Sequence, residues 1–324
     1  MNTAASMYID GVVLEDRPCP NGCAPADEAV IEGEDRLHGL RGRFTVVRCR
    51  RCGLMRTNPR PTPQTIGAYY PSDYGPYQST PVIPKVKPST WHRRLRARLT
   101  RFFGKDVRRL PDIAPGHLVE IGCASGAYLG EMRAKGWSVE GIEFSDDAAR
   151  TARSLGLVVQ TASVETAAPP QQPADVLAAW MVLEHLHEPL AALAKIRAWV
   201  RPGGWLVAAV PDAGALERRL FGEYWYGLHL PAHLYHYTPA TLRTLLDKAG
   251  WTLVAVRWQP NAMNLFNSLE WMSEARGWPR VLKATRWMKN SPKAGSLRKR
   301  LGWLLGVTRQ SGRMEFWARP KDKA

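Results

Sequence analysis

Four cysteines near the start of the chain form two close pairs that could bind a metal ion. Cys19 and Cys23 have the spacing C-x3-C, and Cys49 and Cys52 have the spacing C-x2-C. Two thiolate pairs, each on a tight turn, can converge tetrahedrally on one zinc ion. Four unrelated buried thiols are the alternative, whereas a redox role for Cys49 and Cys52 lacks the βαβ surroundings typical of such a pair. We therefore expect a zinc-ribbon-like module with a structural Zn2+ over residues 1–60.

A second group of chemically active side chains lies in the stretch PAHLYHYTP, at 231–239. Histidine exchanges a proton near neutral pH and so suits general-base catalysis. We predict His233 as the base, with His236 and Tyr235 as alternatives, and we expect His185, in the stretch LEHLH, to face the same substrate. For each of these side chains the competing interpretation is structural: the ring bonds backbone groups and holds its loop in place.

The stretch VEIGCASGAYL has the composition of a nucleotide-binding turn. Gly122 and Gly126 let the backbone approach a ligand, with the N-terminus of the following helix directed at it. A dinucleotide-binding turn has a third glycine where this chain has Leu129. Glu120 would crowd a pyrophosphate but could hold a cationic group, and Glu143, at the end of the next strand, is placed to accept both ribose hydroxyls. A ligand with a ribose and a positive charge but no phosphate fits best.

Regular elements must position these residues, and the sequence alternates between strand and helix signals from Pro111 onward. Ser145 and Thr238 stand where helices should begin, and Glu184 could cap the helix after the fourth strand. The pattern predicts an α/β fold, a doubly wound, Rossmann-like sheet of seven strands with its ligand at the carboxyl ends of the strands. In chain order, the predicted strands are HLVEIG, WSVEGIEFS, LVVQTA, ADVLAAWMVL, WLVAAVP, WTLVAVRWQ and SGRMEFWARP.

The ordered set VEIGCASGAYL, GIEFSDDA, ADVLAAWMVLEHLHEPLAAL and RPGGWLVAAVPD resembles the class I S-adenosylmethionine-dependent methyltransferases over about 111–258. One departure is Ala124, where that family usually has a glycine. The resemblance implies S-adenosyl-L-methionine as the cofactor, bound by the glycine turn and by the strand ends that follow it. The cofactor-binding residues that it implies are Glu120, Gly122, Ala124, Gly126, Glu143, Phe144, Val164 and Trp180.

The histidine-rich stretch resembles a block of bacterial methyltransferases that act on sugars and secondary metabolites. Zinc-ribbon sugar C-methyltransferases have a comparable block and a further C-terminal domain. The resemblance implies O- or C-methylation of a small-molecule or glycan-type acceptor, such as a nucleotide- or lipid-linked sugar. Two other classes stay open: an RNA methyltransferase whose zinc ribbon and basic segments hold phosphates, and a non-catalytic binding protein on a methyltransferase fold.

The positive charge of the chain is concentrated in two segments. The net charge is +16. Residues 85–109 carry ten Lys/Arg and one acid, and residues 276–323 carry fourteen Lys/Arg and two acids. Within the first segment, WHRRLRARLTRFFG predicts a basic amphipathic helix. Both segments favour an anionic partner: the acceptor itself, an acidic membrane surface or, as the weaker option, RNA.

No stretch reaches the roughly 18 uninterrupted apolar residues of a membrane-spanning helix, and the first residues lack the basic and apolar regions of a secretion signal. We therefore expect a cytoplasmic protein, with peripheral membrane contact through the two basic segments as an option.

The long connection between the last two strands predicts a functional insert. The expected domains are a zinc-ribbon-like module (1–60), a Pro/Tyr linker with the basic helix (61–110), a cofactor-binding core (111–260), a helical cap insert (261–310) and a last strand with a basic tail (311–324).

Overall fold

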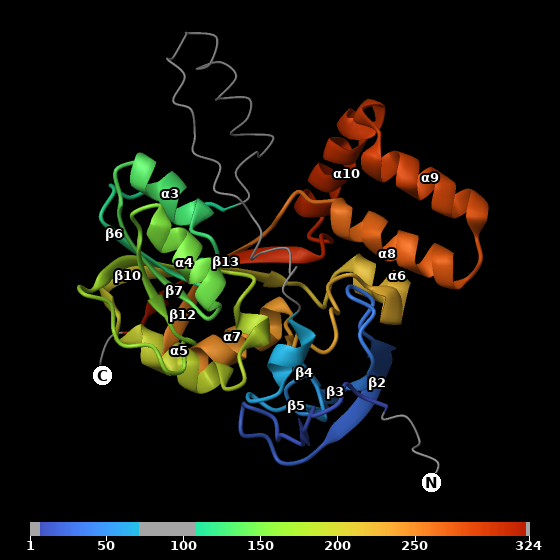
Figure 1. Cartoon of the computed structure of the whole chain (residues 1–324), viewed down its shortest axis with the longest axis horizontal. Coiled ribbons are helices and arrows are strands. Elements are labelled where there is room, and N and C mark those ends of the chain that lie inside the picture. Colours follow the sequence, from blue (N-terminus) through green and yellow to red (C-terminus); the bar gives the residue numbers. More distant parts are fainter. Residues whose placement is uncertain (1–6, 71–107, 322–324) are drawn as a thin grey trace.

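The computed structural model describes residues 7–70 and 108–321 (Figure 1). The predicted basic helix in WHRRLRARLTRFFG lies outside these residues. A seven-stranded sheet forms the centre of the molecule, in the order β12-β13-β10-β9-β6-β7-β8. Only β13 runs antiparallel to its neighbours, so the predicted doubly wound sheet is confirmed. The strands are β6 (His117–Ile121), β7 (Ser138–Glu143), β8 (Val158–Thr161), β9 (Ala174–Trp180), β10 (Val200–Pro211), β12 (Trp251–Trp258) and β13 (Arg313–Pro320).

Helices cover both faces of this sheet, which explains why its central strands are apolar on both sides. Alternate residues of β6 point to opposite faces: Val119 joins the core under α5 and α7, whereas Leu118 joins the core under α3 and α4. Ser145 caps α4 through its hydroxyl, and Thr238 caps α7, as the sequence predicts. The helices are α3 (Ala127–Ala134), α4 (Asp146–Ser154), α5 (Pro189–Arg197) and α7 (Pro239–Lys248).

The N-terminal residues form a second, four-stranded sheet that includes part of the histidine loop, residues 225–237. Its order is β11-β4-β3-β2, and β11 pairs antiparallel with β4, so that Tyr235 lies opposite Arg56. Apolar side chains of this sheet share one core with the loop before β11. The strands of this sheet are β2 (Asp27–Glu34), β3 (Arg43–Cys49), β4 (Met55–Thr57) and β11 (Tyr235–His236). Strands β1 (Leu14–Glu15) and β5 (Arg60–Pro61) pair with each other in a separate two-stranded sheet, and the 3-10 turn η1 (Ile66–Tyr69) follows.

The connection between β12 and β13 is a helical insert, which Figure 1 shows to the right of the sheet, away from α3 and α4. Its last helix packs closely on the end of β12, because a Cβ on Gly302 would lie 2.8 Å from the Pro260 carbonyl oxygen. No helix within the described residues is long and apolar enough to cross a membrane. The insert consists of α8 (Met263–Ala275), α9 (Pro279–Asn290), η4 (Pro292–Ala294) and α10 (Gly295–Val307).

Candidate active site and metal centre

The glycine turn after β6 requires left-handed backbone at three positions. Gly122 and Gly126 have φ angles of 69° and 81°, and Ala124 has a φ angle of 47°. An alanine in this left-handed conformation costs about 1 kcal/mol of strain. Ala124 therefore carries strain at a position where the family that the sequence resembles usually has glycine. A Cβ on Gly126 would overlap the Leu157 side chain, so this turn has no space for a larger residue. Helix α3 begins directly after Gly126 and directs its first N–H groups back to the turn.

Two buried carboxyl groups flank this turn. Glu143, at the end of β7, accepts hydrogen bonds from the backbone N–H groups of Ala124 (2.7 Å) and Ser145 (2.8 Å), which fixes the turn to the second strand. Glu120 lies in β6, and its Oε2 atom has no hydrogen-bond partner among the described residues. Burial raises the pKa of Glu120 to about 8, against the opposing attraction of Arg108. An unpartnered buried carboxyl of this kind is suited to a cationic ligand group.

The other predicted cofactor residues lie on or after neighbouring strands. Trp180 ends β9, and its indole N–H has no partner within the described part of the chain. Its ring packs edge-on against Tyr128 at 5.3 Å between centroids. Phe144 is 64% exposed, directly after Glu143, whereas Val164 is buried. The carboxyl ends of β6, β7 and β9 therefore carry two acids, an indole donor and an exposed aromatic ring.

A cluster of histidines lies beyond the end of β9, around His233. Its Nδ1 atom lies 2.9 Å from the Gly227 carbonyl oxygen, which can only accept, so Nδ1 carries the proton and Nε2 presents a lone pair. This Nε2 atom lies 3.3 Å from Nδ1 of His229 and 4.0 Å from Oε1 of Glu184. His229 adopts a φ angle of 37°, a left-handed conformation that a non-glycine residue adopts at a cost.

His185 is the second member of the cluster, with its ring centroid 4.7 Å from that of His233. Its Nδ1 atom lies 2.9 Å from both the Ala232 carbonyl oxygen and the Tyr70 hydroxyl. The structure thus brings together two of the four histidine and tyrosine side chains that the sequence proposes for catalysis. It adds Tyr70, which comes from the N-terminal part of the chain.

Glu184 is the acidic member of the cluster. It is fully buried in η2 (Leu183–His185), and neither of its carboxylate oxygens has a hydrogen-bond partner among the described residues. Burial raises the pKa of Glu184 to about 8, lowers that of His185 to about 4 and holds that of His233 well below its usual value. Single ligand atoms of these three residues lie within 4.8 Å of one another, so the set could share a proton or hold a metal ion.

Helix α5 begins later, at Pro189, with Glu188 at its N-cap, so Glu184 is not its cap.

Tyr235 and His236 lie on β11 and make other contacts. The Tyr235 hydroxyl accepts a hydrogen bond from Nη1 of Arg60 (3.0 Å) and donates to the His187 carbonyl (3.3 Å). His236 is buried beside Trp225, with 6.4 Å between ring centroids, and burial lowers its pKa to about 3. Among the described residues, neither side chain forms a hydrogen bond or a ring contact with His185 or His233, although both are close to His233 in sequence.

Backbone hydrogen bonds hold the histidine loop against the N-terminal sheet. The Leu234 N–H donates to the Glu184 carbonyl (2.7 Å), and the Thr57 N–H donates to the Leu234 carbonyl (2.9 Å). The Thr57 hydroxyl donates to the His233 carbonyl at 2.8 Å.

Sequence reasoning missed Thr57 and Tyr70 as parts of the site because no local sequence pattern connects them with residues so far along the chain. Glu184 and His229 could have been found as neighbours of the predicted histidines.

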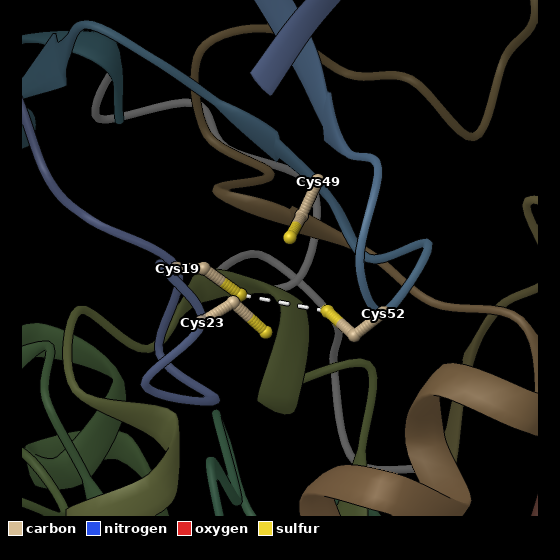
Figure 2. Close-up of side chains that lie close together, drawn as sticks. All are labelled: Cys19, Cys23, Cys49 and Cys52. Atoms are coloured by element: carbon tan, nitrogen blue, oxygen red, sulfur yellow. Dashed lines mark hydrogen bonds between the residues drawn. The ribbon is translucent and has the colours of Figure 1, made fainter. Parts of the chain in front are cut away.

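Four cysteine side chains from two turns point toward one another in the N-terminal sheet (Figure 2). Their sulfur atoms all lie within 4.8 Å of one another, and the Sγ atoms of Cys19 and Cys52 are 3.5 Å apart. Each turn includes a glycine with positive φ, Gly22 (67°) and Gly53 (77°), whose N–H donates to the carbonyl of the first cysteine of its pair. All four thiols are free, as tetrahedral coordination of one metal ion requires.

Comparison with known proteins gives one family match that covers most of this site. Residues 90–256 match a family model described as a methyltransferase domain. A ubiquinone biosynthesis O-methyltransferase of Albidiferax ferrireducens is 29% identical over 108 residues, which is 31% of this chain and 43% of that protein. One of Thiobacillus denitrificans is 28% identical over 153 residues, with 43% and 65% covered. The chain thus spans only part of the length of these curated relatives.

Among solved structures, an S-adenosylmethionine-dependent methyltransferase of Mesorhizobium loti matches with a TM-score of 0.44 and 16% identity, over 68% of this chain and 96% of that one. The family match includes the glycine turn, both flanking acids and the described histidine cluster except Tyr70. It does not reach the cysteine pairs or the helical insert.

Proposed function

Because the chain belongs to the methyltransferase-domain family, we propose that it transfers a methyl group from S-adenosyl-L-methionine to an oxygen of a small-molecule or glycan-type acceptor. The observation that carries this proposal is the close approach of the proposed cofactor side of the site to the proposed acceptor side. A Cβ on Gly122 would lie 2.7 Å from Cγ2 of Val182, and Val182 precedes Glu184 by two residues. The glycine turn therefore adjoins the segment that carries the histidine cluster.

On the cofactor side, the residues present fit the chemistry of S-adenosyl-L-methionine. The cofactor supplies an electrophilic methyl group on a cationic sulfur. Glu120 offers a buried carboxyl without a partner at Oε2, which suits a positive charge, and Glu143 is assigned to the ribose hydroxyls. Phe144 exposes a ring suited to a flat base, and the indole N–H of Trp180 offers a donor.

On the acceptor side, we assign proton removal to His233. Its Nδ1–H is held by the Gly227 carbonyl, so Nε2 is oriented to take a proton. Glu184, at 4.0 Å, would stabilise the imidazolium that forms once its own carboxyl group has lost its proton to solvent. Burial keeps the pKa of His233 well below its usual value, so the imidazole is neutral at pH 7 and is a weak base. A weak base suits an acidic hydroxyl such as a phenol or enol better than an alkyl alcohol. The relatives named as O-methyltransferases agree with oxygen as the acceptor atom.

We also assign the four N-terminal cysteines to a structural zinc ion. The four sulfur atoms and the two glycine-containing turns fit a tetrathiolate site, and a site closed by four protein ligands has no position for a substrate. The metal would fix the turn between β3 and β4 to the turn before β2, and β4 in turn holds the histidine loop.

The test uses purified protein, 13C-methyl-labelled cofactor and a cell extract separated into small-molecule, lipid and nucleic-acid fractions. We expect label in the small-molecule or lipid fraction, and the 13C chemical shift of the product then distinguishes oxygen from carbon or nitrogen. His233→Ala should lower turnover by roughly 10²–10⁴-fold and leave cofactor affinity unchanged. Label in a nuclease-sensitive fraction would overturn the acceptor class, and activity of His233→Ala within a few-fold of the wild type would overturn the assignment of the base.

A further inference from the structure

The helical insert exposes large apolar side chains to an unusual degree. Fourteen such side chains are exposed in the described residues, and seven of them lie between 278 and 307. The core does not cover these side chains, although the insert packs on β12 and on the short helix α6 (Leu216–Phe221) through its other faces. The seven are Trp278, Val281, Trp287, Leu297, Trp303, Leu304 and Val307.

On α10 three of these side chains form a stripe along one side of the helix. Leu297, Leu304 and Val307 are 54%, 49% and 54% exposed, and their spacing of seven and three residues places them on one side of a helix. Leu305 and Gly302, on the other side, are buried. The helix therefore has two apolar sides, of which only one is used within the chain.

The same insert is strongly cationic. Residues 276–310 contain ten Lys/Arg and no Asp or Glu. Arg286 and Lys289 form ion pairs with acids of α8, mainly Glu270. No carboxylate lies within 4.0 Å of the other eight cations among the described residues. These are Arg276, Arg280, Lys283, Lys293, Arg298, Lys299, Arg300 and Arg309.

We propose that the helical insert is a docking surface for an anionic lipid bilayer. Aliphatic side chains and tryptophans enter the interfacial layer of a bilayer, while neighbouring lysines and arginines contact acidic headgroups. The stripe of Leu297, Leu304 and Val307 supplies the first component, and Lys299 and Arg300, which are also exposed on α10, supply the second.

Other occupants of this surface fit less well. A nucleic acid would use the cations but would leave the aliphatic stripe in water. A second copy of the chain carries the same net charge of +16, and residues 85–109 of this chain are also strongly basic, so both would be repelled. An acidic bilayer complements both the charge and the apolar stripe.

Docking here would bring the proposed acceptor site close to the lipid, a consequence that rests on the proposed function. Helix α8 contacts the histidine loop, because the Tyr226 N–H donates to the Ser268 hydroxyl at 2.8 Å and the Tyr226 and Trp271 rings lie 5.1 Å apart. An acceptor with an apolar tail could then reach the loop from the membrane. The docking itself is tested without any methyl transfer, so its failure is distinguishable from a failure of the proposed function.

The experiment measures co-sedimentation of the full chain with vesicles of phosphatidylcholine alone or mixed with phosphatidylglycerol, at physiological ionic strength. The test variant is Leu297→Glu/Leu304→Glu. The matched control is Val158→Glu/Val254→Glu, which makes the same change in charge at two side chains that are each 51% exposed outside the insert. Circular dichroism and thermal unfolding verify that both variants fold.

We expect the wild type to bind only vesicles that contain phosphatidylglycerol. The test variant should lose at least about tenfold in partitioning, and the control should stay within about twofold. Lys299→Gln/Arg300→Gln should also weaken binding, more at low salt than at high salt. Failure of the wild type to bind acidic vesicles, including the case in which it binds only RNA, would overturn the proposal. Equal losses in the test and control variants would overturn it as well, since net charge alone would then explain the binding.

Discussion

Glu184 and Glu120 are both carboxyl groups buried without full hydrogen bonding among the described residues, and they lie on the two sides of the proposed reaction. Each is stable in the free protein in its neutral form, because burial raises the pKa of each to about 8. Each becomes useful when an opposite charge develops beside it: a bound cation for Glu120, an imidazolium for Glu184. The two groups therefore give different experimental signatures.

Glu184→Gln should lower turnover and leave cofactor binding unchanged. The amide has nearly the same shape but cannot stabilise an imidazolium at His233, so we expect a fall of roughly 10²–10³-fold. Steady-state kinetics measures the fall, and calorimetry measures the cofactor affinity. Glu188→Gln is the control, because Glu188 is a half-exposed carboxylate on the same segment that pairs with Arg17. Equal kinetics for the two variants would remove Glu184 from the mechanism.

Cofactor affinity should depend on pH through Glu120. Its pKa of about 8 means that the carboxyl is mostly neutral at pH 7 and must lose a proton to hold a cation. Affinity should therefore rise as the pH increases toward 8, by at most about tenfold per pH unit, and then level off. Calorimetry from pH 6 to 9 measures this dependence for S-adenosylmethionine and for its uncharged-sulfur product.

Glu120→Gln is the control for that experiment. It should weaken binding of the cationic cofactor more than binding of the product, and it should flatten the pH dependence. The same pH profile in the wild type and in Glu120→Gln would assign the titration to another group.

At the scale of secondary structure, local features alone specify the geometry of the glycine turn, which is the proposed cofactor site. Its residues could be predicted because the geometry is local: Gly122, Gly126 and the following α3 are adjacent in sequence. The strands could be predicted for the same reason, as apolar runs bounded by glycine and helix caps. Strand β11 has only two residues, and its pairing with β4 depends on a distant segment, so no local pattern indicates it.

Gly126→Ala should destabilise the protein by about 2–4 kcal/mol, because the alanine would combine left-handed strain with overlap at Leu157. Chemical denaturation measures the free energy of unfolding. The matched control is Gly130→Ala within α3, where the new Cβ would have no neighbour within 4 Å. There we expect stabilisation of about 0.5–1 kcal/mol from helix propensity. A similar effect at both positions would mean that the turn is not strained as described.

At the scale of the whole molecule, the cysteine turns, the N-terminal sheet and the histidine loop form one connected structure. The sequence predicts the cysteine pairs and the histidines as separate features, and the structure joins them through β4 and β11. Thr57 contacts the His233 carbonyl directly. That connection could not be predicted, because it depends on tertiary packing between segments with no shared pattern.

Loss of the proposed zinc ion should therefore affect catalysis as well as stability. Cys49→Ser should abolish metal binding and lower the free energy of unfolding by more than about 2 kcal/mol. Turnover should also fall, because β4 no longer fixes His233. Metal analysis, thermal unfolding and kinetics measure the three effects. Cys123→Ser, at a buried thiol outside the N-terminal sheet, should keep the metal, and a metal-free wild type that unfolds at the same temperature would refute the zinc assignment.

The pairing of β4 with β11 also orders the events of biosynthesis. Thr57 leaves the ribosome 176 residues before its partner His233, a delay on the order of ten to thirty-five seconds at usual rates of translation. During this interval the edge of β4 has no strand to pair with, and such an edge can associate with other chains. A nascent chain stalled before residue 233 should therefore depend on a chaperone, even when its cysteine turns have already closed.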